Sequence, residues 1–278
     1  DYWTQEIDIE LPQIVRLERP SGGQEALSAA AKILSDAEFP VILNGAGVVI
    51  GGAILESAAL AEKLTAPVCC GYQHNDAFPG SHPLFVGPLG YNGSKAAMEL
   101  IAKADVVLAL GTRLNPFSTL PGYGIDYWPR DAKVIQVDIN SDRIGLTKKV
   151  TVGIQGDAKL VAEQLLELLS DSAGDHGRDK RSDLIAETKS RWFQQLSSMD
   201  HEDDDPGTTW NERARKREPD RMSPRMAWRA IQAALPTEAI ISSDIGNNCA
   251  IGNAYPTFEE GRKYLAPGLF GPCGYGLP

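Results

Sequence analysis

Two glycine-bounded segments in the last forty residues carry the residue types of an anion-binding site. The first, Asp244–Asn248, follows the apolar run Ala239–Ser243 and precedes a short predicted helix. Free backbone N–H groups and the helix dipole favour negative charge at such a helix N-terminus. The second, Gly268–Pro278, is a loop dense in glycine. Neither segment is specific alone, but the pair predicts an anion pocket where the two meet.

Arg113 is a second candidate for contact with an anion. It comes just after the apolar run Asp105–Leu110, and it is followed by Asn115 and a loop rich in proline and glycine. The planar guanidinium of arginine suits carboxylate, phosphate or sulfonate oxygens. A salt bridge across a domain interface would use the same side chain, and the sequence favours neither interpretation over the other.

A partial glycine motif and two loop histidines are weaker signals, and each has a simple structural explanation. Gly45 and Gly47 form part of a dinucleotide fingerprint, but the third glycine, Gly51, comes one residue late and the expected acidic partner is not evident. We therefore expect a tight strand-to-helix turn whose glycines allow close packing, while an approach to some phosphate stays open. His74 and His82 lack cysteine or carboxylate partners in register, so we expect hydrogen-bonded loop histidines and predict no metal ligand.

Alternating helices and strands between residues 22 and 172 are expected to position these side chains. Short apolar runs predict buried strands, and apolar residues at helical spacing predict helices between them. Such alternation implies right-handed βαβ units, and hence an α/β, Rossmann-like domain with a mostly parallel sheet. Ligands bind beyond the carboxyl ends of the strands in such sheets. The predicted strands are Pro40–Leu43, Pro67–Cys70, Asp105–Leu110, Lys133–Asp138 and Val150–Ile154, and the predicted helices are Gln24–Ala37, Ala53–Leu64, Ala96–Ala102 and Asp157–Leu169.

Three further ranges flank or follow this central domain. Residues 1–21 are predicted to be an interdomain linker, and residues 173–222 a charged linker with one docked helix around Trp192 and Phe193. Residues 223–278 begin a second, incomplete α/β domain, opened by Ser223 as a helix cap and Pro224 at the first helical position. We expect both ends of the chain to be cuts in a longer polypeptide.

Composition excludes several classes of protein. The 278 residues are 42% hydrophobic and 23% charged, as in soluble globular proteins, and the net charge of −10 makes nucleic acid an unfavourable partner. No apolar stretch approaches the roughly 18 residues of a membrane helix. The four cysteines are too few and too irregularly spaced for a disulfide framework, so we expect buried, reduced thiols and a cytoplasmic protein.

The segments singled out above resemble thiamine-diphosphate-dependent enzymes of the acetolactate-synthase family. Asp244–Asn248 and Gly271–Pro278 are similar to paired segments that open the diphosphate-binding domain of that family. Leu110–Arg113 and its surroundings are similar to the family's central domain in order and spacing. Within the family, the strings Gly71–Gly80 and Leu114–Pro129 resemble the branch that cleaves sulfoacetaldehyde.

This resemblance implies an acyltransferase that uses thiamine diphosphate and Mg²⁺. Its expected substrates are sulfoacetaldehyde and phosphate, its products acetyl phosphate and sulfite, and its assembly a homodimer or homotetramer. The family's cofactor-activating glutamate and its metal ligands would lie outside this sequence, so the chain alone is expected to be inactive. By the same resemblance, Arg113, Tyr91 and Asn92 would line the substrate channel, and the cofactor would contact Gly246, Asn247, Asn248, Gly271 and Cys273.

Two alternatives remain open from the sequence. One is another thiamine-diphosphate lyase or synthase, such as acetolactate synthase, whose central domain would hold FAD; the string Leu114-Asn115-Pro116 argues weakly against it. The other is a non-catalytic nucleotide-binding module in which the turn at Gly45–Gly47 holds ADP or a similar ligand.

Overall fold

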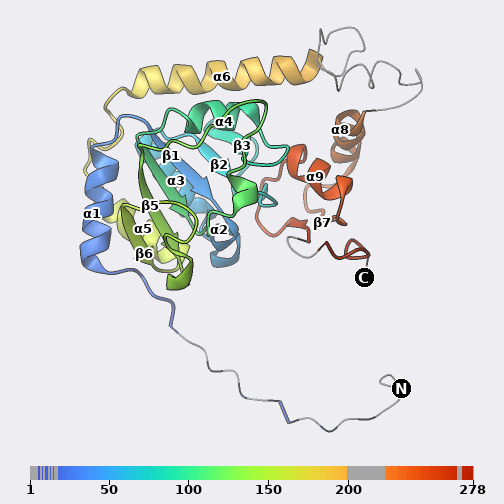
Figure 1. The fold of residues 1–278 in the computed structure, drawn as a ribbon, viewed down its shortest axis with the longest axis horizontal. Helices are drawn as coiled ribbons and strands as arrows, with labels where there is room; N and C mark the ends of the chain where they lie inside the picture. The colour runs from blue at the N-terminus through green and yellow to red at the C-terminus, as the bar shows by residue number, and fades with distance from the viewer. Residues whose placement is uncertain are drawn as a thin grey trace.

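The computed structural model shows a parallel sheet covered by helices on both faces, with a smaller unit at its side (Figure 1). It describes residues 18–198, 223–267 and 271–277, and residues 6, 8, 10, 11, 13 and 15. The sheet has six strands in the order β3-β2-β1-β4-β5-β6. These strands are β1 (Pro40–Asn44), β2 (Val68–Cys70), β3 (Phe85–Pro88), β4 (Val106–Leu110), β5 (Lys133–Asp138) and β6 (Val152–Gln155).

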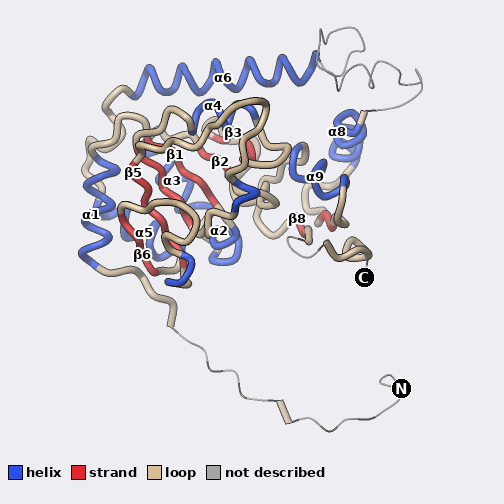
Figure 2. Tube along the Cα trace, in the orientation of Figure 1, coloured by secondary structure: helices blue, strands red, loops and turns tan. Residues whose placement is uncertain are grey.

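The helices form one layer on each side of this sheet (Figure 2). The apolar residues of the first layer pack with Cys70, and those of the second with Cys69, because neighbouring residues of a strand point to opposite faces. The first layer comprises α1 (Gln24–Ser35), α2 (Ala46–Gly51), α3 (Ile54–Leu64) and α5 (Ala158–Leu168). The second comprises α4 (Lys95–Ile101) and α6 (Arg178–Ser198).

The predicted α/β fold with a parallel sheet is confirmed. The strands of the central domain fall where apolar runs predicted them, because β1 and β4 are buried along their whole length. The strand β3 and the helix α2 were not predicted. β3 contains Gly87 and Pro88 and lies at the sheet edge, where a strand pairs on one side only and tolerates such residues.

The smaller unit contains two helices and a two-stranded parallel sheet. Ser223 caps its first helix as predicted, since its hydroxyl accepts a hydrogen bond from the N–H of Met226 at 3.1 Å. In the apolar run Ala239–Ser243 only two residues form a strand, because only Ile241 and Ser242 pair with the neighbouring strand. The elements are α8 (Pro224–Ala234), β7 (Ile241–Ser242), α9 (Asn247–Ala254) and β8 (Tyr264–Leu265).

The helix predicted around Trp192 and Phe193 is α6, the longest described helix, which packs against α4 (Figures 1 and 2). Residues 199–222, the rest of the predicted charged linker, lie outside the described residues. Within the described part of the chain, no helix combines the length and the apolar character needed to cross a membrane.

Arg181 fastens the first turn of α6 to the central domain. Its side chain is 2% exposed, and its guanidinium donates five hydrogen bonds, all to backbone carbonyl oxygens. Two of these carbonyls end α3 and one precedes β1, so a single side chain joins three segments. The acceptors, at 2.6 to 2.9 Å, are the carbonyls of Glu38, Leu64, Thr65, Gly174 and His176.

We predict that Arg181→Met lowers the free energy of unfolding by about 3 kcal/mol, because buried carbonyl groups lose their donors. Urea unfolding followed by circular dichroism measures the change. The matched control is Lys180→Met, an exposed neighbour on the same helix, which should change stability by less than about 0.5 kcal/mol. Equal losses in the two variants would contradict this role for Arg181.

Candidate functional site

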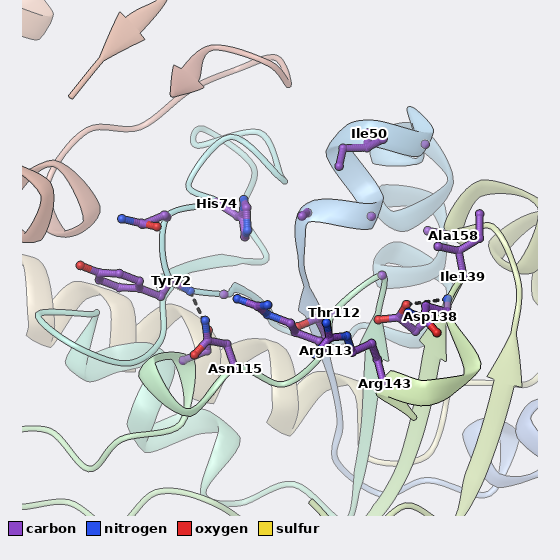
Figure 3. Close-up of a pocket in the computed structure, with 18 of the residues that line it drawn as sticks. Ile50, Tyr72, His74, Thr112, Arg113, Asn115, Asp138, Ile139, Arg143 and Ala158 are labelled. Atoms are coloured by element: carbon purple, nitrogen blue, oxygen red, sulfur yellow. Dashed lines mark hydrogen bonds between the residues drawn. The ribbon is translucent and has the colours of Figure 1, made fainter. Parts of the chain in front are cut away.

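A cavity of about 560 Å³ lies at the carboxyl ends of the central strands (Figure 3). The turns after β1, β2, β4 and β5 line most of it, which is where a parallel sheet is expected to bind ligands. The residues after β6, Gly156–Ala158, add to this wall, and the smaller unit completes it through Tyr264, Leu265, Ala266 and Tyr275. The cavity therefore touches both parts of the chain.

The glycine turn after β1 is the close-packed turn that the sequence predicted, and the structure shows that its partner is the turn after β4. A Cβ atom on Gly45 would lie 2.5 Å from the Cβ of Thr112, and one on Gly47 would lie 2.7 Å from the Cα of Gly111. Gly111 has φ of +59°, a conformation that favours glycine. These glycines thus allow backbone-to-backbone contact, and Gly47 and Gly111 also line the cavity.

Arg113 lies in the cavity, two residues beyond the end of this packed turn. Its backbone is held in place, because the hydroxyl of Thr147 donates to the carbonyl of Leu114 at 2.9 Å and Gln136 donates to that of Thr112 at 3.1 Å. Across the described residues, no ion pair or hydrogen bond engages its guanidinium. Arg113 thus has no salt bridge among the residues that the structure describes, and its contact with a ligand stays a prediction.

His74 lines the same cavity and has an unusual environment. Burial, and secondarily the positive charge of Arg113, lower the pKa of its imidazole to about 4. No hydrogen bond to its ring is found in the described part of the chain. The expectation of a hydrogen-bonded loop histidine is therefore wrong for His74, because its ring faces the cavity. It holds for His82, whose ring nitrogens lie 3.3 Å from a Glu62 oxygen and 3.2 Å from the N–H of Leu84.

The loop after β2 connects the central domain to the smaller unit. The N–H of Gln73 donates to the side-chain oxygen of Asn253 at 2.6 Å, and the amide of Asn75 donates to the carbonyls of Asn253 and Pro256. Asp76 accepts bonds from the N–H groups of Lys263 and Tyr264, although burial raises its pKa. The loop that carries His74 is thus fixed by the smaller unit.

The two glycine-bounded segments meet as predicted, over the part of them that the structure describes. The carboxylate of Asp244 accepts from the N–H of Ile245 at 2.8 Å and from that of Gly274 at 2.9 Å, and both bonds lower its pKa. Gly246 adopts φ of +90° at the start of α9, with open space where a Cβ would lie. Residues 268–270 lie outside the described residues.

The predicted cofactor contacts gather around this junction. Asn247 and Asn248 are exposed in the first turn of α9, and Gly271 lies on the neighbouring loop, where an added Cβ would lie 3.9 Å from Ile245. Cys273 is exposed, contrary to the expectation of buried thiols, whereas the other three cysteines are buried; all four are free. Tyr275, on the same loop, reaches the cavity that holds Arg113.

Tyr91 and Asn92 do not line the cavity that holds Arg113. The N–H of Tyr91 donates to the carbonyl of Phe117, and its own carbonyl accepts from the side chain of Asn253, both at 3.1 Å. Asn92 is exposed with φ of +54°. The channel role given to this pair stays a prediction. The sequence missed His74, although its place just after a strand end was a signal.

Comparison with known proteins places the central domain in a known family and gives relatives for the whole chain. Residues 27–165 match the family described as thiamine pyrophosphate enzyme, central domain. The whole chain is 79% identical to a sulfoacetaldehyde acetyltransferase of Roseovarius nubinhibens and 78% identical to a probable sulfoacetaldehyde acetyltransferase of Rhizobium meliloti. It spans about half of these relatives, 46% and 47% of their lengths. A probable acetolactate synthase large subunit of Methanocaldococcus jannaschii is 31% identical over 98% of the chain and is covered over 44% of its length.

We predict that Gly47→Ala destabilises the protein by about 1–3 kcal/mol, because the added methyl group would overlap the backbone of Gly111. Thermal unfolding measures the loss. Gly51→Ala is the matched control on the same helix, since its Cβ would meet Asp157 at an ordinary 3.4 Å. A similar change in both variants would show that the close contact of the two turns is not what requires glycine.

We also predict that the His74 imidazole stays uncharged down to about pH 5 and titrates near 4. Since the unfolded chain, with a pKa near 6.5, binds the proton first, His74 contributes stability above that pH, and the contribution is lost as pH falls through 4. Histidine NMR resonances followed against pH test this, and His74→Gln identifies the signal. A His74 signal with a midpoint near 6.5 would contradict the prediction.

Proposed function

This chain belongs to the thiamine pyrophosphate enzyme family, and we propose that it forms part of an enzyme converting sulfoacetaldehyde and phosphate to acetyl phosphate and sulfite. The observation that carries the proposal is the 78–79% identity, over the whole chain, to relatives named sulfoacetaldehyde acetyltransferase and probable sulfoacetaldehyde acetyltransferase. The local structure supports it through a cavity whose arginine has no partner among the described residues, and through an open helix N-terminus at the start of α9.

The residues around α9 fit a diphosphate group. Gly246 leaves the first turn of the helix open, and no side chain caps it, so backbone N–H groups there can meet an anion. We propose that Asn247 and Asn248 hold the diphosphate and that Gly271 and Cys273 lie against the rest of the cofactor. Thiamine diphosphate would supply a carbon nucleophile that also accepts electrons from the bond being broken.

The chain's own contribution is to bind and orient charged reactants. Arg113 carries a permanent positive charge into the cavity and can stabilise an anionic group of a substrate. Asp244 holds the loop at Gly274 against the start of α9 and so keeps the two cofactor-binding segments together. We propose a channel role for Tyr91 and Asn92 as well, on the loop between β3 and α4.

Mg²⁺, self-association and a cytoplasmic location are also proposed from the family. Among the described residues, no cluster of three or more histidine, cysteine, aspartate or glutamate side chains is arranged to hold a metal ion. We therefore propose that the metal ligands lie elsewhere in the enzyme. A homodimer or homotetramer would bring further residues to the exposed first turn of α9.

The alternative functions are less well supported. Acetolactate synthases match this chain at only 27–31% identity, far below the acetyltransferases. A non-catalytic nucleotide-binding module does not explain why the cofactor-binding segments meet. A visible absorbance spectrum of the full-length protein tests the first alternative. A bound flavin would absorb visible light, whereas thiamine diphosphate alone would not.

The decisive assay measures sulfite release from sulfoacetaldehyde by the full-length enzyme, with and without phosphate. We expect release to depend on added thiamine diphosphate, and acetyl phosphate to accumulate only when phosphate is present. Release of acetolactate from pyruvate without any sulfite from sulfoacetaldehyde would refute the proposal.

We predict that Asn247→Asp or Asn248→Asp weakens thiamine diphosphate binding at least about tenfold, because a negative charge is placed beside the diphosphate. The same substitutions should not destabilise the fold, since a carboxylate near a helix N-terminus is favourable. Calorimetric titration and thermal unfolding measure the two effects. Gln194→Glu, which adds the same charge on α6, is the control and should bind the cofactor normally.

A further inference from the structure

The charged groups of the 560 Å³ cavity differ in how they are held. Asp157 pairs with Arg19 at 3.3 Å and caps α5, and Asp138 accepts a hydrogen bond from the N–H of Asn140 at 2.9 Å. Asp138 lies at one end of the cavity, near Arg143, an exposed cation that also lines the cavity (Figure 3). Arg113 and His74 lie towards the other end, and neither side chain has a hydrogen-bonding partner in the part of the chain that the structure describes.

We infer that Arg113 and His74 together form a subsite for a monoanionic group, and that this subsite binds the sulfonate of the substrate and not the phosphate. This inference rests on the proposed function and deepens it. The sequence singled out Arg113 as an anion contact without deciding between sulfonate and phosphate, and it gave His74 no role.

The charge of the subsite matches one negative charge. Arg113 is permanently cationic, while burial keeps the imidazole of His74 uncharged at neutral pH. An uncharged imidazole still has one N–H to donate, and a sulfonate accepts hydrogen bonds without carrying a proton of its own. A phosphate approaches two negative charges above about pH 7 and would be matched better by two cations.

The position of the subsite is fixed from two sides. The N–H of Tyr72 donates to the hydroxyl of Ser118 at 2.9 Å, which holds the loop to the segment after Arg113. On the other side of His74, Gln73 and Asn75 bond to the smaller unit. Bonds from both the central domain and the smaller unit therefore hold the loop that carries His74.

The test uses the full-length enzyme and isethionate, an unreactive two-carbon sulfonate, as a probe. We expect Arg113→Ala to raise both the KM for sulfoacetaldehyde and the inhibition constant of isethionate about tenfold or more, as for a lost charge-assisted hydrogen bond. The KM for phosphate should stay within about twofold. For Arg113→Lys, the KM for sulfoacetaldehyde and the inhibition constant of isethionate should lie between the values of the wild type and of Arg113→Ala. Lysine keeps the charge but loses the planar pair of donors.

His74 requires conservative variants, because a merely structural role would also respond to truncation. His74→Ala should raise the same two constants about fivefold, and either His74→Asn or His74→Gln should restore them, since each keeps one N–H donor at the position of a ring nitrogen. Arg130→Ala, which removes one exposed positive charge outside the cavity, is the control and should leave all three constants unchanged. Thermal unfolding and cofactor affinity verify that each variant is folded.

The outcomes separate this inference from the proposed function. Direct binding of isethionate and of inorganic phosphate to the resting enzyme, measured by calorimetry, needs no turnover. If the wild type releases no sulfite but binds isethionate through Arg113 and His74, the proposed function fails and the subsite stands. The sulfonate subsite is refuted if sulfite is released but substitutions of Arg113 and His74 leave isethionate binding unchanged. It is also refuted if those substitutions raise the KM for phosphate instead.

Discussion

The contact between the turn after β1 and the turn after β4 is the constraint on which the site depends. Gly47 and Gly111 bring two backbones together at the carboxyl edge of the sheet, closer than any side chain would permit. Interiors pack densely, so this contact fixes where each turn can run. It determines that Arg113 emerges into a cavity at the sheet edge instead of into solvent or a core layer.

A second constraint is the polar junction between the central domain and the smaller unit. Gln73, Asn75 and Asp76 are buried, and each bonds to backbone or side-chain groups across that junction. Buried polar groups are costly unless paired, so their bonds specify one way of docking. The docked arrangement completes the cavity wall with Tyr264 and Tyr275.

Two arginines of the central domain differ in their hydrogen bonding, and the difference bears on function. The buried guanidinium of Arg181 donates five hydrogen bonds, whereas that of Arg113 has none among the described residues. A fully bonded arginine stabilises the fold, while one that faces a cavity without partners is available to a ligand. The structure thus distinguishes two residues of identical chemistry by their surroundings.

The sequence by itself determined the alternation of helices and strands, the parallel sheet and the edge of it at which the cavity lies, because apolar periodicity and turn residues are local properties. It also identified Arg113 and the two glycine-bounded segments from residue types at strand and helix ends. Only the tertiary structure decided that His74 joins Arg113, that Tyr91 lies outside their cavity, and that Arg113 has no salt bridge to any described residue. Those facts depend on contacts between segments far apart in the chain, such as Gln73 with Asn253, which local patterns do not encode.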